Sequence, residues 1–305
     1  MSSSSSLLHR YQRFVPFLAV LGAVTALGIG TSWAKHTLFP LVGAQGTTAV
    51  RVGFSALLLL LLWRPWRWQL SRTDLRATML YGAMLGATNL TFYMSLRTLP
   101  FGLAVAIEFS GPLLMAVLSS RRAIDFVWVA LAVVGLGMLL PLGGMNGSTL
   151  DPTGVAYALA AATFWALYIV FGKRVGHLHA GHSVSLGLVA AAVVVVPVGV
   201  AHAGTALLSP YVLLVGVGVA AISSAIPISL EMMALKRLPK EAFGIMISME
   251  PAVAALLALV LLGEVLTFNQ WLAIALIMSA SMGTAMTARR SEQTKATAAQ
   301  EAVAT

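Results

Sequence analysis

Four ionisable side chains interrupt segments that are otherwise apolar: Lys35, Arg51, Glu108 and Glu250. A charged group inside a lipid bilayer is costly, so each of them is a candidate for function if these segments cross a membrane. A carboxylate can bind an ammonium group or exchange a proton, whereas Arg and Lys can bind a carboxylate. We therefore predict that these four residues bind a small charged solute or a proton.

Glu250 lies ten residues beyond Lys240. On a helix this distance is about 15 Å, close to the middle of a hydrocarbon core about 30 Å thick. Pro251 follows directly, and a proline inside a helix bends it and frees a carbonyl, which makes room for a ligand or water. We predict a site that exchanges protons or binds a substrate. The alternative is a protonated Glu250 that bonds to a neighbouring helix.

Glu108 lies eight residues beyond Pro100, which is roughly 12 Å along a helix that starts at the opposite side. Pro112 follows one turn later on the same face. These two residues predict a second functional carboxylate beside a helix kink. The alternative is a structural ion pair between Glu108 and Arg51.

Arg51 and Lys35 are the cations of this group. Arg51 lies inside the second predicted helix, in the same half of the membrane as Glu108, and Lys35 lies near the end of the first helix. Either could bind the carboxylate of a substrate. Alternatively, Lys35 extends to the membrane surface and Arg51 only neutralises Glu108.

Aromatic and amide side chains near these charges could line a small cavity. The candidates are Trp33, Trp165, Tyr168, Tyr93 and Asn89. Packing against lipid or against other helices is the alternative for each of them.

Motifs of enzyme active sites are absent from the sequence. There is no HExxH, no GxGD and no P-loop lysine. There is also no cysteine, which excludes disulfides, thiolate metal sites and a cysteine nucleophile. His177, His179 and His182 fall in one predicted loop without an accompanying carboxylate, so a solvated loop is favoured over a metal site. We predict no metal, no cofactor and no enzymatic activity.

The composition indicates the elements that hold these residues. Of 305 residues, 59% are hydrophobic and 10% are charged, and the mean hydropathy is +0.89. Soluble proteins carry about 25% charged residues, so an ordinary soluble enzyme, a disordered chain and a nucleic-acid binder are excluded. The sequence predicts an all-α integral membrane protein with ten transmembrane helices at residues 14–38, 45–63, 75–95, 101–119, 124–142, 153–172, 182–201, 210–232, 241–261 and 266–287.

The connections between these helices alternate in positive charge. Sixteen of the 19 Lys and Arg residues fall on the side of the N-terminus, two fall on the opposite side, and Arg51 lies within a helix. Cytoplasmic loops are enriched in Lys and Arg. Both termini are therefore predicted to be cytoplasmic, which requires an even number of spans.

The chain contains an internal repeat. Residues 94–100 (MSLRTLP) resemble residues 233–239 (MALKRLP) at an offset of 139, and residues 31–39 resemble residues 163–171 at an offset of 132. The first offset also relates Pro112 to Pro251 and Asp125 to Glu264. Each half then has five helices, an odd number, so the halves must be inverted relative to each other. Inverted repeats are typical of transporters that expose a central site alternately, although an old duplication without a present role would leave the same pattern.

The domain organisation follows from this repeat. We predict an N-terminal tail at residues 1–13, a first five-helix unit at 14–142, a second at 153–287 and a cytoplasmic C-terminal tail at 288–305. The composition of the C-terminal tail favours an irregular end.

The sequence resembles a known group of transporters. The segment Ser248–Leu256 (SMEPAVAAL), with Leu262-Gly263-Glu264, resembles the repeat signature of EamA-like drug/metabolite transporters. More specifically, Trp33–Gly43 (WAKHTLFPLVG) and Glu108–Leu113 (EFSGPL) are similar to the bacterial threonine and homoserine exporters. The similarity covers about residues 14–288 and departs from the signature at Gly111, which stands where the second half has Glu250.

The resemblance implies a ten-helix bacterial inner-membrane transporter that exports small neutral amino acids, threonine and homoserine foremost, by antiport with protons. Its partners would be small amino acids, protons and the lipid bilayer, with neither a nucleic acid nor an obligate protein partner. Two alternatives remain: an efflux transporter of the same fold for another solute, such as a hydrophobic drug, and an intramembrane enzyme.

Overall fold

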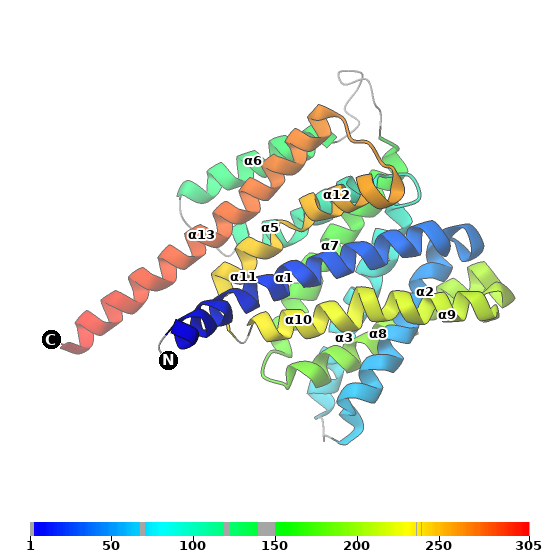
Figure 1. The fold of residues 1–305 in the computed structure, drawn as a ribbon, viewed down its shortest axis with the longest axis horizontal. Coiled ribbons are helices and arrows are strands. Elements are labelled where there is room, and N and C mark those ends of the chain that lie inside the picture. Colours follow the sequence, from blue (N-terminus) through cyan, green and yellow to red (C-terminus); the bar gives the residue numbers. More distant parts are fainter. Residues whose placement is uncertain are drawn as a thin grey trace.

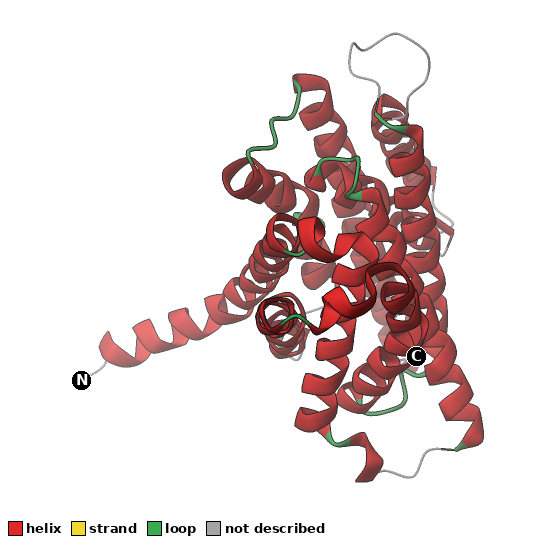
Figure 2. Cartoon of the chain, turned by 90° about the vertical axis from the view of Figure 1, so that its right-hand side faces the viewer, coloured by secondary structure: helices red, strands yellow, loops and turns green. Residues whose placement is uncertain are grey.

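The computed structural model describes residues 3–67, 71–118, 123–139, 150–235, 237–238 and 240–304. Within these ranges every regular element is helical (Figure 2). Arg121, Arg122, Lys236 and Pro239, used above for the orientation and the repeat, lie outside the described residues, as do the last residues of the predicted range 124–142.

Each predicted range contains helix. The α-helices are α1 (Ser3–Thr37), α2 (Phe39–Trp63), α3 (Arg72–Ser95), α4 (Phe101–Glu108), α5 (Ser110–Leu118), α6 (Ala123–Leu139), α7 (Pro152–Arg174), α8 (Ala180–Ala203), α9 (Pro210–Ala220), α10 (Ile226–Leu235), α11 (Lys240–Ile247), α12 (Glu250–Leu262) and α13 (Phe268–Ala304). Three short elements are η1 (Pro65–Arg67), η2 (Gly204–Leu208) and the π-helical turn η3 (Ala221–Ala225).

Three of the predicted ranges are divided in the structure. The range 101–119 contains α4 and α5, the range 210–232 contains α9, η3 and most of α10, and the range 241–261 falls on α11 and α12. In the described part of the chain, seven helical segments are long and apolar enough to cross a membrane, and Phe101–Met115 and Phe126–Leu139 are shorter apolar helices. The number of long apolar helices indicates a multi-pass membrane protein. The total of ten spans stays a prediction.

The two ends of the chain differ from the sequence prediction. Helix α1 begins at Ser3, inside the predicted tail, and α13 continues to Ala304 instead of ending near residue 287. Residues 288–304 contain neither Gly nor Pro and are rich in Ala, Gln, Glu, Lys and Arg, which are strong helix formers. Both termini lie on the same side of the molecule in Figure 1, at the left.

The helix contacts follow the division into two halves. If α1, α2, α3, α4–α5 and α6 correspond in order to α7, α8, α9–α10, α11–α12 and α13, exchanging the halves turns the most extensive helix contacts into other observed contacts. The contact of α3 with α7 becomes that of α10 with α1, and the contact of α1 with α12 becomes that of α7 with α4 and α5. Contacts of α2 with α8, α4 with α12 and α6 with α13 map onto themselves. This pairing is what a two-fold relation between the halves would give.

We name the two ends of the molecule by these helices. The inner end is where α2 ends and α3 begins, and the outer end is where α1 ends and α4 begins. The main apolar core lies between them and includes Tyr93, Leu99, Leu103 and Ile107, all at most 1% exposed.

Candidate functional site

A cavity of about 570 Å³ lies between helices of both halves. Its walls are mostly apolar and come from α1, α2, α3, α4, α7, α8, α10, α11 and α12, together with the turn η3. The polar side chains that line it are Thr31, Arg51, Ser55, Tyr81, Thr88, Asn89, Glu108, Tyr168, Ser223, Ser224, Glu231 and Glu250. A volume of this size suits a small solute, and the lining brings one cation and three carboxylates into one apolar interior.

Arg51 is held in place by contacts from both halves. Its Nε donates to Ser223 Oγ at 2.8 Å and its Nη2 donates to the Ser223 carbonyl at 3.2 Å. Its Nη1 donates to Asn89 Oδ1, and its guanidinium lies 5.4 Å from the centre of the Tyr93 ring. A guanidinium has five N–H groups, and the bonds to described residues use three of them, which leaves two for a ligand.

Ser223 lies in the π-helical turn Ala221–Ala225, and its carbonyl can accept from Arg51 because Pro227 lacks the N–H that would bond to it in a continuous α-helix. A π-helical turn departs from the regular α-helical hydrogen-bond pattern and is frequent at functional sites. Helix α1 packs directly on this turn, since a Cβ added at Gly30 would lie 2.9 Å from the Ser223 backbone nitrogen. Gly30 therefore permits the approach that fixes Ser223 beside Arg51.

Glu108 is the last residue of α4 and is buried. Pro112 lacks the N–H that would bond to the Glu108 carbonyl in a continuous helix, and the helix is interrupted at Phe109. Trp165 packs edge-on against the Phe109 ring, with 5.3 Å between the ring centres. The interruption and this ring pair place the Glu108 carboxyl group in the cavity wall.

Glu250 is the first residue of α12, after a break at Ser248 and Met249. Pro251 removes the N–H that would bond to the Ile247 carbonyl, which separates α11 from α12. The carboxyl group thus lies at a helix N-terminus inside the molecule, where the helix dipole favours negative charge.

Among the described residues, no cation lies within ion-pair distance of the three carboxylates of the cavity. In the part of the chain that the structure describes, the ion pairs within 4.0 Å are Lys35–Glu264 and His177–Asp74. Arg51 therefore does not form a direct ion pair with Glu108, although the two interact electrostatically over a longer distance. Glu250 lies close enough to both Glu108 and Glu231 for their charges to interact.

Glu231 is a lining residue that the sequence analysis missed. It follows the uncharged stretch 175–230 and precedes Lys236 and Arg237, so its charge resembles that of a helix end. The signal that could have found it is its spacing from Ser223 and Pro227, which puts all three on one helix face.

The predicted aromatic and amide set is divided by the structure. Asn89, Trp165 and Tyr168 line the cavity, and Tyr93 lies behind Arg51 without lining it. Tyr168 stacks on Tyr81 with 4.6 Å between ring centres, and their hydroxyl groups are 2.8 Å apart. Trp33 is not among the lining residues. It packs against α9, where a Cβ added at Gly218 would lie 2.7 Å from the indole ring.

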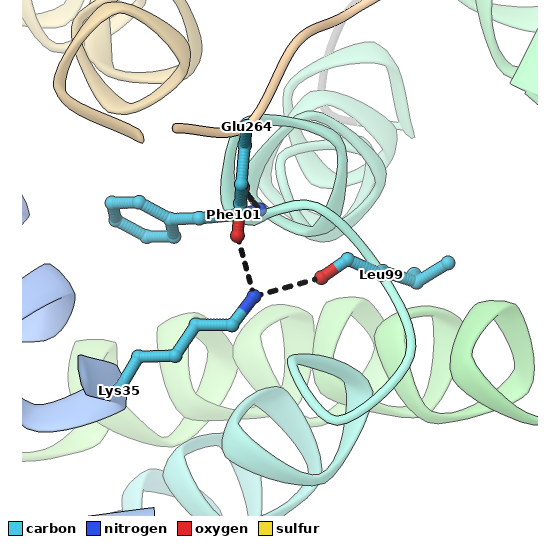
Figure 3. A network of polar contacts seen from close by, with 4 residues as sticks. All are labelled: Lys35, Leu99, Phe101 and Glu264. Carbon is cyan, nitrogen blue, oxygen red and sulfur yellow. Dashed lines mark hydrogen bonds and ion pairs between the residues drawn. The ribbon is translucent and has the colours of Figure 1, made fainter. Parts of the chain in front are cut away.

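Lys35 lies outside the cavity, in a polar network at the outer end (Figure 3). Its Nζ contacts Glu264 Oε1 at 2.7 Å and donates to the Leu99 carbonyl at 3.2 Å. The other carboxylate oxygen of Glu264 accepts the Phe101 N–H at 2.6 Å. The network joins the end of α1, the start of α4 and the α12–α13 connection.

Two further polar contacts lie at the helix ends. At the outer end, the Thr153 N–H and the Thr98 side chain hold the pKa of the Asp151 carboxyl below its usual range. At the inner end, His177 Nε2 lies 3.0 Å from Asp74 Oδ1. His177 therefore joins the loop after α7 to the start of α3.

The chain is similar to a family of transporters along most of its length. The sequence model of the EamA-like transporter family matches residues 152–286. A threonine/homoserine exporter RhtA of Salmonella typhimurium (strain LT2) is 47% identical over 282 residues, which cover 92% of this chain and 95% of that protein. The RhtA of Escherichia coli (strain K12) is 46% identical over 288 residues, covering 94% and 97%.

One solved structure, described as "Crystal structure of protein", has the same fold. Its TM-score is 0.53 at 19% sequence identity, and the match covers 92% of this chain and 98% of that one. At this identity the likeness concerns the fold alone.

Proposed function

The chain belongs to the EamA-like transporter family, and we propose that it exports threonine and homoserine across the bacterial inner membrane in exchange for protons. The cavity carries this proposal. An amino acid is a zwitterion that needs an acceptor for its ammonium group and a donor for its carboxylate. Counting contacts among the described residues, the cavity offers carboxylates without cation partners and an Arg51 with two unused N–H groups.

The binding geometry follows from these groups. The substrate carboxylate bonds to the free edge of the Arg51 guanidinium, and the ammonium group binds to Glu250 or Glu108. The side-chain hydroxyl of threonine or homoserine has Ser, Thr, Asn and Tyr partners in the lining. The apolar remainder of the wall excludes water and strengthens each of these contacts.

Proton coupling results from competition at the carboxylates. A proton that reaches Glu250 from outside neutralises it and releases the ammonium group. Substrate arriving from the cytoplasm binds the deprotonated form again. The membrane potential supplies about 2.3 kcal/mol per charge at 100 mV, which is enough to drive export against a gradient.

Alternating access follows from the two halves. We expect ten spans, both termini in the cytoplasm and the inner end of the molecule at the cytoplasmic face. The paired helix contacts support a rocking motion of one half against the other around the cavity. The Lys35–Glu264 ion pair joins the two halves at the outer end, and in this proposal it is the contact that keeps that end closed.

The test is transport by the purified protein in proteoliposomes. Radiolabelled threonine should show counterflow, homoserine should compete with it, and a hydrophobic cationic dye should not. An outward flux of dye without threonine counterflow would overturn the proposal in favour of drug efflux.

A second measurement tests whether Glu250 couples threonine efflux to the movement of protons. Glu250→Gln should abolish the acceleration of threonine efflux by an imposed pH gradient while the protein still inserts. Asp151→Asn, which removes a carboxylate at the outer surface, is the matched control and should behave as wild type. Wild-type coupling in Glu250→Gln would refute the role of Glu250.

A further inference from the structure

Glu231 occupies a separate position in the cavity. It lies on α10 four residues before the end of that helix at Leu235, about 6 Å from the inner end. Glu250 is about 15 Å from the inner end by the same measure, since α11 begins at Lys240. The two carboxylates are thus at successive depths, with Glu231 closer to the cytoplasm.

The side chain of Glu231 faces the cavity. The residues of η3 and α10 that line the cavity are Ser223, Ser224, Pro227, Ile228, Glu231 and Met232, a spacing that forms one helix face. Glu231 interacts electrostatically with Tyr168 and with Glu250. In the described part of the chain it makes no ion pair within 4.0 Å, so its carboxylate is open to a ligand.

Arg51 and Glu231 lie at different levels of the cavity. Arg51 bonds to Ser223, and Ser223 and Glu231 are eight residues apart, which is about 12 Å along the helix. Glu231 therefore offers a carboxylate closer to the inner end than the position at which Arg51 holds the substrate.

We propose that Glu231 is a loading site, at which the ammonium group of a cytoplasmic amino acid binds before it moves to Glu250. The inference rests on the proposed function, because it assigns a first step to the same export. The pair Tyr81–Tyr168 lines the same cavity. The ligand chemistry is that of a small primary ammonium ion.

The test uses inside-out membrane vesicles, in which the cytoplasmic face is exposed. Uptake of radiolabelled threonine is measured as a function of its concentration. Glu231→Gln should raise the KM about tenfold, as expected for loss of one charge-assisted hydrogen bond, while the maximal rate changes less than twofold. Ser229→Ala, on the exposed face of the same helix, is the matched control and should keep the wild-type KM.

Two inhibitors distinguish a structural role of Glu231 from binding of the ammonium group. Ethanolamine has the ammonium group without a carboxylate, and 3-hydroxybutyrate has the carboxylate without an ammonium group. Glu231→Gln should lose inhibition by ethanolamine at the cytoplasmic face and keep inhibition by 3-hydroxybutyrate. Equal loss of both, or a KM within twofold of wild type, would overturn the loading site.

The same experiment also covers two failures: a variant that does not insert, and wild-type vesicles that take up no threonine. If Glu231→Gln does not insert, Glu231→Asp replaces it. This variant keeps the charge on a shorter side chain, so an intermediate KM supports the site and an unchanged KM refutes it. If wild-type vesicles take up no threonine, the proposed function itself fails, and the loading site falls with it.

Discussion

Lys35 and Glu264 form an ion pair of 2.7 Å that joins the two halves of the molecule at its outer end. Lys35 belongs to α1 of the first half and Glu264 to the α12–α13 connection of the second. Glu264 also accepts the N–H of Phe101, a residue that lines the cavity (Figure 3). Opening the cavity outward by separating the halves must therefore break this network.

Loss of the ion pair should favour the outward-open state. Hydrogen bonds to charged groups contribute about 1.5–3 kcal/mol, enough to shift the balance between two conformations by tenfold or more. The chain has no cysteine, so a single Cys at Phe92 in the cavity wall can report access. A membrane-impermeant maleimide applied from outside should label Phe92→Cys several-fold faster when Glu264→Gln is added.

The same labelling assay contains its controls. Lys35→Met should act as Glu264→Gln does, and the double variant should add little, because both remove one interaction. Asp151→Asn also lies at the outer end and should leave the labelling rate unchanged. Equal labelling of the Glu264→Gln and parent proteins would contradict the closing role of the network.

Arg51→Lys should weaken threonine binding although the charge is kept. The guanidinium bonds to Ser223 and Asn89 and still has N–H groups for a carboxylate, whereas one ammonium group cannot do both. We expect the KM for threonine uptake into inside-out vesicles to rise at least about tenfold. The exposed Arg97→Lys is the control for the substitution type, and a KM within twofold of wild type in Arg51→Lys would contradict the role of Arg51.

The helices could be predicted because their signals are local. Pro, Gly and charged residues mark the ends of apolar segments, and every predicted range contains helix in the described residues. The breaks before Pro112 and Pro251 were indicated by the prolines alone. The turn Ala221–Ala225 also has a proline signal, since Pro227 lacks the N–H that would bond to the Ser223 carbonyl, but the sequence does not specify that the break takes the form of a π-helical turn.

The cavity could be predicted only in part. Depth along a helix indicated Glu108, Glu250 and Arg51, and the structure places all three in one cavity. Lys35 was predicted as a fourth member although it lies near the end of its helix, but its partner Glu264 is 229 residues away in the sequence, and such a pairing depends on tertiary packing. Glu231 was not predicted as a lining residue, because a charged residue near a helix end is common and does not indicate a site.

Glu108→Gln should leave the protein as stable as wild type while it reduces coupled transport. Removing one partner of a buried ion pair costs about 3–5 kcal/mol, but Glu108 has no such partner within 4.0 Å among the described residues. The thermal midpoint in detergent measures this. Glu264→Gln, which breaks an observed pair, should lower the midpoint, and an equal decrease in Glu108→Gln would show that Glu108 is structurally paired.

Gly111→Ala should destabilise the protein. The same steric reason explains why the carboxylate of the first half is at position 108 and not at position 111. A Cβ at Gly111 would be 2.0 Å from the carbonyl oxygen of Ala162, so α5 and α7 would have to separate. The position that matches Glu250 therefore has no space for a glutamate in the first half, and the carboxylate is found at Glu108, about one turn earlier.

The steric cost opposes the better helix propensity of alanine, which is worth about 1 kcal/mol. Overpacking typically costs about 1–3 kcal/mol, and a contact this close to backbone belongs at the upper end, so we expect a lower thermal midpoint in detergent. Gly137→Ala is the control, since a Cβ there meets no heavy atom within 4 Å, and it should be neutral or stabilising. If Gly111→Ala were as stable as Gly137→Ala, close packing of α5 on α7 could not be the reason for glycine at position 111.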